Sequence, residues 1–202
     1  MNNYVDAIRP KIYTICGMEM KPFSLGHYLL LEQIDSPFLT DDENATIDLV
    51  SGIYSFYFTL LICAQSYEDN IIMLNDEKIV KKLCKQFSKN LKKTMKIDKQ
   101  WNIFACINMF KEYVQYFTQM PIFQVERENK SLPSGIDWKQ NLFTIAKNEW
   151  HYSDSEVLNM PLKRLFYEWC SYAEKNGAIR VQNIDEITML QEYKKRQQTS
   201  TV

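Results

Sequence analysis

The chain has 202 residues and 46% of them are hydrophobic, which is enough material for one good-sized domain or two small ones with a real core. Only 5 glycines and 6 prolines are available for turns, so a sandwich or barrel of many short strands is disfavoured and long helices are favoured. The formal net charge of −1 predicts neither strong attraction to nucleic acid nor an acidic tail. We therefore expect an all-α protein, an irregular multi-helix bundle of about seven to eight helices with an N-terminal arm.

The first part of the chain predicts an arm followed by a helix. Two prolines and a glycine interrupt residues 1–23, so we expect an irregular arm with a short strand at 11–16. Ser24 can accept hydrogen bonds at a helix start, and the apolar residues after it predict a helix that ends near Ile34.

A long apolar helix is predicted from Asn44 to Tyr67. From Leu49 onward it carries no charge over 19 residues, which is long enough to span a bilayer and leaves a transmembrane helix as the alternative. Gly52, Gln65 and several hydroxyl side chains interrupt the apolar run, and acidic residues flank both ends. These features favour a central helix that is buried in the bundle.

The helix predicted over 76–96 has an apolar side and a basic side. No acidic residue occurs between Lys78 and Ile97, which leaves 16 of the 24 basic residues for the rest of the chain against 25 acidic ones. A solvated helix face and a patch for phosphate or an acidic partner both fit this pattern. Without arginines or interleaved aromatic residues, nucleic-acid binding here would be non-specific. The basic face consists of Lys78, Lys81, Lys82, Lys85, Lys89, Lys92, Lys93 and Lys96.

The next helix is predicted over 98–119, and a polar linker over 121–135 follows it. Pro133 and Gly135 lie in this linker, which divides the chain into a helical bundle, 1–120, and a helical unit, 136–202. The two parts either share one core or hinge about the linker. The residues that we expect on the inner side of the 98–119 helix are Trp101, Phe104, Ile107, Phe110, Val114 and Phe117.

The stretch 137–177 gives the clearest helix signals. Trp138, Leu142 and Ala146 recur at helical spacing, which predicts a first helix. Ser153 stands three residues before Glu156, the pattern of a capping box, and predicts a short second helix.

A third helix of this stretch is predicted after Pro161, which suits a first helical turn. It has a full apolar face, and Gly177 is placed to end it. After a short extended piece, 178–181, a last helix is predicted over 183–196.

Few residues indicate chemistry. We expect His27 to be a structural histidine in an apolar helix, although a pocket around either histidine would favour an enzyme. His151 stands near three acidic residues that could bind a divalent metal, but helix-start roles explain two of them. A Cys–His nucleophilic pair stays open, since such residues meet in space. The five cysteines are widely spaced, and we expect reduced, largely buried thiols at Cys16, Cys63, Cys84, Cys106 and Cys170.

Two passages resemble a known group of proteins. Residues 23–32, FSLGHYLLLE, followed by Ser36-Pro37-Phe38, resemble the opening of small proteins encoded among the tail genes of phages and prophages. Residues 156–162, EVLNMPL, with the helix to Gly177, are similar to the closing half of that group and to helical tail-assembly chaperones. In those chaperones this helix contacts the tape measure or tail tube protein. The chain departs from them in its long N-terminal half.

Together these observations predict a non-enzymatic phage morphogenesis protein that acts by protein–protein interaction, as a tail-assembly chaperone or a tail or virion component. We expect no catalytic, cofactor-binding or metal-binding residues. Expected partners are other phage tail or virion proteins, in the host cytoplasm or the virion. Neither a membrane nor nucleic acid is an expected partner. The alternative is non-specific nucleic-acid binding through the lysine-rich face 78–96. The residues predicted to bind the partner are Trp138, Trp150, Tyr152, Met160, Leu162, Phe166 and Trp169.

Overall fold

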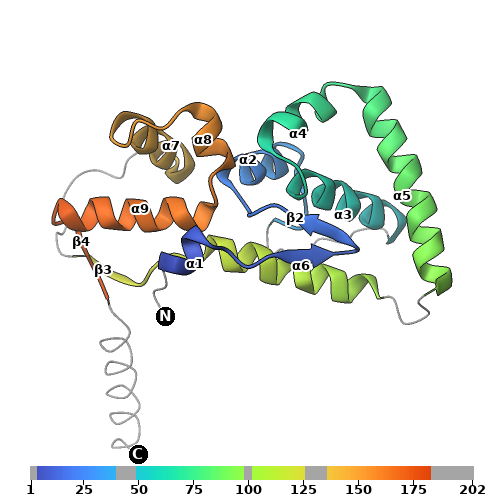
Figure 1. Cartoon of the computed structure of the whole chain (residues 1–202), viewed down its shortest axis with the longest axis horizontal. Coiled ribbons are helices and arrows are strands. Elements are labelled where there is room, and N and C mark those ends of the chain that lie inside the picture. Colours follow the sequence, from blue (N-terminus) through green and yellow to red (C-terminus); the bar gives the residue numbers. More distant parts are fainter. Residues whose placement is uncertain (1–3, 40–48, 98–101, 126–135, 183–202) are drawn as a thin grey trace, which may run out of the picture.

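The structure is a computed structural model that describes residues 4–39, 49–97, 102–125 and 136–182, except the side chains of 49–51 and 90–97. These residues form nine helices and two small two-stranded sheets, so the prediction of an all-α fold is confirmed (Figure 1). The helices are α1 (Tyr4–Ile8), α2 (Leu25–Gln33), α3 (Leu49–Cys63), α4 (Tyr67–Leu74), α5 (Glu77–Ile97), α6 (Ile103–Thr118), α7 (Trp138–Asn148), α8 (Asp154–Asn159) and α9 (Leu162–Lys175). The strands are β1 (Tyr13–Ile15), β2 (Met18–Met20), β3 (Phe123–Val125) and β4 (Ile179–Val181).

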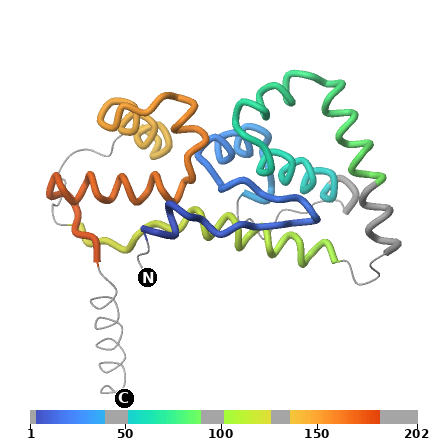
Figure 2. The backbone as a smooth tube through the Cα atoms, in the orientation of Figure 1, coloured from blue at the N-terminus to red at the C-terminus, as the bar shows by residue number. Residues whose placement is uncertain are grey.

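The N-terminal residues form more regular structure than the expected arm. After α1, β1 and β2 make an antiparallel hairpin with Tyr13 opposite Met20. Its turn is Cys16-Gly17, and both residues have positive φ, 51° and 75°. Tyr13 and Met20 are buried, and β1 packs on α6 (Figure 2). This segment is therefore part of the core.

The helix predicted over 44–67 is wrong at its C-terminal end. α3 ends at Cys63, and a separate helix, α4, begins after Ser66. The Ser66 hydroxyl accepts a hydrogen bond from the Asp69 backbone N–H and so starts the new helix. Residues 44–48 lie outside the described part of the chain. None of the described helices is long and apolar enough to cross a membrane.

α5 packs against α3 and α4 through its apolar side. The Phe87 ring stacks on the Tyr57 ring, with 3.4 Å between the ring centroids and 15° between the planes. The Asp76 carboxylate accepts a hydrogen bond from the Lys78 backbone N–H at 2.8 Å, which satisfies a free donor at the helix start. The bounds predicted for this helix agree with the structure to within one residue.

The prediction that Phe104 lies inside is wrong. Its exposure is 64%, because the buried side of α6 is formed by residues that lie on another part of the helix circumference. Trp101 lies outside the described residues. The buried side of α6 consists of Cys106, Phe110, Tyr113 and Phe117.

The start predicted for the short helix α8 and the end predicted for α9 are confirmed. Ser153 and Glu156 form the predicted capping box of α8. After α9, Gly177 has a φ of 65°, and the next backbone N–H, of Ala178, donates to the Ala173 carbonyl at 2.9 Å. That bond belongs to a Schellman motif, which explains why a glycine ends this helix.

Residues on both sides of 121–135 share one hydrophobic core. The largest cluster of buried side chains contains Leu31 and Phe110 from the N-terminal part and Leu165 from α9. The Leu162 backbone N–H donates to the Phe23 carbonyl at 2.8 Å across this boundary. The predicted linker begins with β3, which pairs with β4, and 126–135 lie outside the described residues. In Figure 1, α7, α8 and α9 lie at one end of the molecule and α5 at the other.

Candidate functional site

The seven residues predicted to bind a partner occupy different depths. Three of them are buried in the hydrophobic core: Met160, Leu162 and Phe166. Trp138 is the most exposed of the seven, at 43%. The others, Trp150, Tyr152 and Trp169, are half-buried.

Trp138 stands between two cavities. One has a volume of about 530 Å³ and reaches Tyr28 of α2, and the other has a volume of about 370 Å³ and reaches Trp169 of α9. Trp138 and Phe166 line both cavities, so the two rings form a common wall between them. We call the two cavities with this wall the Trp138 groove.

Aromatic contacts fix the Trp138 ring. Its centroid lies 5.3 Å from that of Tyr28 in an edge-to-face arrangement and 5.8 Å from that of Phe166. The chain places Trp138 at the first position of α7, where the Asp137 carboxylate caps the helix by accepting from the Lys139 backbone N–H at 2.9 Å. The ring is therefore held in place while almost half of its surface meets solvent.

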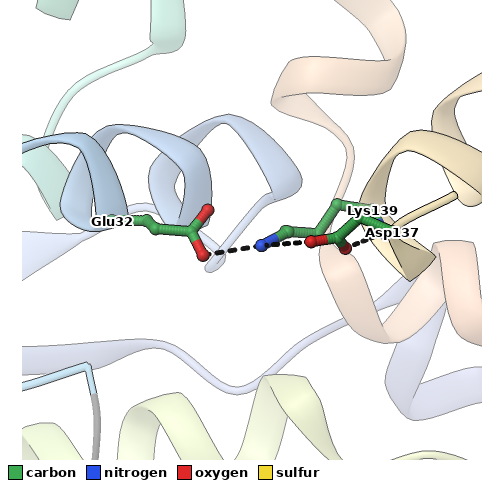
Figure 3. A network of polar contacts seen from close by, with 3 residues as sticks. All are labelled: Glu32, Asp137 and Lys139. Atoms are coloured by element: carbon green, nitrogen blue, oxygen red, sulfur yellow. Dashed lines mark hydrogen bonds and ion pairs between the residues drawn. The ribbon is translucent and has the colours of Figure 1, made fainter. Parts of the chain in front are cut away.

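A short polar network secures the rim of the groove (Figure 3). The Lys139 ammonium lies 2.6 Å from the Glu32 carboxylate and 3.0 Å from that of Asp137, which ties α7 to α2. The hydrogen bond to Glu32 raises the pKa of Lys139, and the hydrogen bond from the Lys139 backbone lowers the pKa of Asp137. The Lys139 side chain is 13% exposed. The ion pairs of Lys139 with Glu32 and Asp137 therefore stabilise the start of α7, next to Trp138.

The two cavities differ in polarity. The smaller cavity is lined by one amide side chain, that of Asn141, and by five large apolar or aromatic ones: Met120, Trp138, Leu142, Phe166 and Trp169. The larger one is lined by apolar residues together with Lys111, Gln115 and Thr118. The walls of the smaller cavity are therefore mostly apolar, and such a cavity binds apolar side chains by removing their surface from water, whereas the walls of the larger cavity are about half polar. Neither histidine lines either of these two cavities.

Sequence reasoning missed the residues on the far side of the groove, which include Tyr28, Phe38 and Val114. They come from α2, the segment after it and α6, and only the folded chain brings them near Trp138. The spacing of the apolar residues along α2 and α6 predicts which positions face the core. It contains no signal for a cavity that the two helices line together.

The two histidines have structural surroundings. His27 is buried, and its Nδ1 accepts from the Ser24 backbone N–H at 3.1 Å. Nε2 therefore carries the proton and donates to the Gln65 carbonyl at 2.8 Å. Exclusion from water lowers the pKa of His27 to about 4. His151 is exposed in a turn with a φ of 58°.

Two of the three acidic residues near His151 have other partners. Asp154 pairs with Lys147, and the Glu156 carboxylate accepts from the Ser153 backbone N–H at 2.8 Å. Within the described ranges, no group of three or more histidine, cysteine, aspartate or glutamate side chains is placed to hold a metal ion.

All five cysteines are free. Cys63, Cys106 and Cys170 are buried, whereas Cys16 and Cys84 are half-buried. Burial raises the pKa of the Cys170 thiol to about 11 and raises that of Cys63 further still. A raised pKa keeps a thiol protonated at neutral pH and makes it a poor nucleophile.

The basic face lies far from the groove. Its lysines at 78, 81, 82, 85 and 89 are all exposed on α5. The side chains of Lys92, Lys93 and Lys96 lie outside the described part of the structure.

Comparison of the chain with protein-family models, with curated proteins and with solved structures gave no match.

Proposed function

We propose that the chain is a non-enzymatic morphogenesis protein of a phage or prophage, which acts in the host cytoplasm or in the virion. It binds other tail or virion proteins through the Trp138 groove and serves as a tail-assembly chaperone or as a tail component. The resemblance of residues 23–32 and 156–162 to tail-gene proteins supports the setting. The geometry of the groove supports the mode of action.

The observation that carries the proposal is the position of Trp138. A tryptophan with 43% exposure between two cavities, held by neighbouring rings and by the Lys139 network, has the surroundings of an interface anchor. Half-exposed aromatic rings beside apolar cavities gain the most from burial by a partner. Because the wall of the groove is already ordered, little conformational entropy is lost on binding.

The first experiment is a tagged pull-down from cells that produce the particle, with mass spectrometry of the lysate complex and of purified particles. Recovery of tail proteins from lysate, with the chain absent from particles, is the result expected of a chaperone. Presence in particles at fixed copy number indicates a structural component. Recovery of no tail or virion protein contradicts the proposal.

The groove is then tested with matched variants. Trp138→Ala is expected to weaken binding of the recovered partner by about 10-fold or more, the usual effect of losing an interface anchor. Phe104→Ala is the control, because Phe104 is an exposed aromatic residue of α6 that does not line the groove. Equal affinities for the two variants would place the partner elsewhere on the surface.

A further inference from the structure

The described lysines of α5 lie along one side of the helix, and we call them the lysine row. Relative to Lys78, the others lie 3, 4, 7 and 11 residues onward, and at about 100° per residue all five fall within roughly a third of the helix circumference. The row extends over about 17 Å of helix axis, one lysine per about 4 Å. Lys92, Lys93 and Lys96 continue the same spacing in the sequence.

The opposite side of α5 is already occupied. Phe87 stacks on Tyr57, and Ile79 and Leu83 pack against the core. The part of α5 whose side chains the structure describes, residues 77–89, therefore has no free apolar side with which to enter a lipid surface, as an interfacial membrane helix requires. The five described lysines are exposed, and α5 lies at one end of the molecule (Figure 1).

The charges of the row are largely unneutralised. Lys81 pairs with Glu77 at 2.7 Å, whereas no acidic side chain of the described residues forms an ion pair with Lys78, Lys82, Lys85 or Lys89. A row of like charges repels itself, so a polyanion that neutralises several of them at once gains affinity through released counterions.

We propose that this lysine row binds the phosphate backbone of double-stranded nucleic acid, without sequence preference and independently of the Trp138 groove. The row places about one lysine per 4 Å of helix axis, and a duplex carries one phosphate per about 1.7 Å of its own axis, so a duplex that lies along α5 brings several phosphates close to these lysines at once. The row lacks arginines and aromatic rings, so it contacts phosphates and reads no bases.

The test uses the full chain and a fluorescent DNA duplex of mixed sequence, with anisotropy measured over a series of salt concentrations. The row variant replaces Lys78, Lys82, Lys85 and Lys89 by Gln. A control variant replaces Lys11, Lys21, Lys147 and Lys175 by Gln, which changes the net charge equally on other surfaces. Thermal unfolding of both variants checks that they are folded.

The wild-type affinity is expected to fall steeply with salt. The row variant is expected to lose at least about tenfold in affinity and about three units of the log–log salt slope, while the control variant keeps most of both. No binding by the wild type, or equal losses in the two variants, overturns the proposal. Stronger competition by polyglutamate than by unlabelled duplex also overturns it, in favour of an acidic protein partner.

Discussion

The side chains of Ser24 and His27 each accept a hydrogen bond from the other residue's backbone N–H at the start of α2. The His27 backbone N–H donates to the Ser24 hydroxyl at 3.2 Å, and the Ser24 backbone N–H donates to Nδ1 of His27 at 3.1 Å. This is a capping box in which a histidine takes the place usual for glutamate or glutamine. Nδ1 can accept the hydrogen bond from the Ser24 backbone N–H only while it carries no proton. The His27 ring can therefore cap the helix only in its neutral form.

Stability should therefore fall as the pH falls through the range in which His27 titrates in the unfolded chain. Its pKa is about 4 in the folded protein and about 6.5 when unfolded, so the unfolded state binds the proton first and the stabilisation present above pH 6.5 is lost as the pH decreases toward 4. Between about pH 7.5 and 5.5, before most carboxylates titrate, the loss should be about 1 kcal/mol. Urea unfolding at the two pH values measures it.

Two variants separate the histidines. His27→Gln should be less stable at neutral pH and should lose most of this pH dependence. His151→Gln should keep the wild-type dependence, because His151 is exposed and lies outside the core. If both variants show the wild-type loss between the two pH values, the titrating group is not His27.

Gly26→Ala should destabilise the protein although alanine favours helices. A Cβ at position 26 would lie 2.6 Å from the Leu158 carbonyl oxygen and 2.7 Å from the Tyr67 ring, so α2 could not keep its distance from α8 and α4. Overpacking of this kind costs about 1–3 kcal/mol, more than the roughly 1 kcal/mol gained in helix propensity. Chemical denaturation gives the difference. An alanine variant as stable as wild type would mean that the helices separate freely here.

Local signals explain how much of the fold could be predicted. The caps at Ser24, Ser153 and Gly177 depend on residues within a few positions of each other, and their helices begin or end there in the structure. The start of α4 was missed although Ser66 and Asp69 have cap spacing, because the apolar run before them suggested one continuous helix. Phe104 was misplaced because apolar residues lie on more than one side of α6.

The candidate site was predictable only in part. Trp138 and Trp169 could be named from their own helices, since each belongs to an apolar stripe. Which of the predicted residues are buried in the core and which are exposed depends on contacts between distant parts of the chain. One such contact is that of Trp138 with Tyr28, which is 110 positions away. Helical periodicity describes one helix at a time, so it cannot show which stripes leave a cavity where they meet.

Tyr113→Phe should lower the free energy of unfolding, because it removes a buried hydrogen bond in the core. The Tyr113 hydroxyl donates to the Lys21 carbonyl at 2.8 Å, and burial raises the pKa of this tyrosine well above its usual value. Removing the hydroxyl leaves that carbonyl without this donor and should cost about 1–2 kcal/mol of unfolding free energy. Tyr116→Phe is the control. Its hydroxyl donates to the Asp6 carbonyl at 3.3 Å and accepts from the Lys11 backbone N–H at 3.4 Å, and the loss of these two longer, partly exposed bonds should cost less. The reverse order in thermal or urea unfolding would contradict this assignment.

Trp169→Ala should weaken both folding and partner binding, whereas Trp138→Ala should mainly weaken binding. Trp169 is half-buried, packs edge-to-face on Phe123 with 5.8 Å between centroids and lines the smaller cavity, so it supports α9 and the groove at once. A fully buried tryptophan costs about 3–5 kcal/mol when truncated, and partial burial reduces this to about 2 kcal/mol. Trp138, with more of its ring in solvent, should cost less than Trp169. Urea denaturation and partner affinity, measured on both variants, give the two quantities separately. If Trp138→Ala proved the more destabilising and left affinity unchanged, Trp138 would be a structural residue and the groove would not be the docking surface.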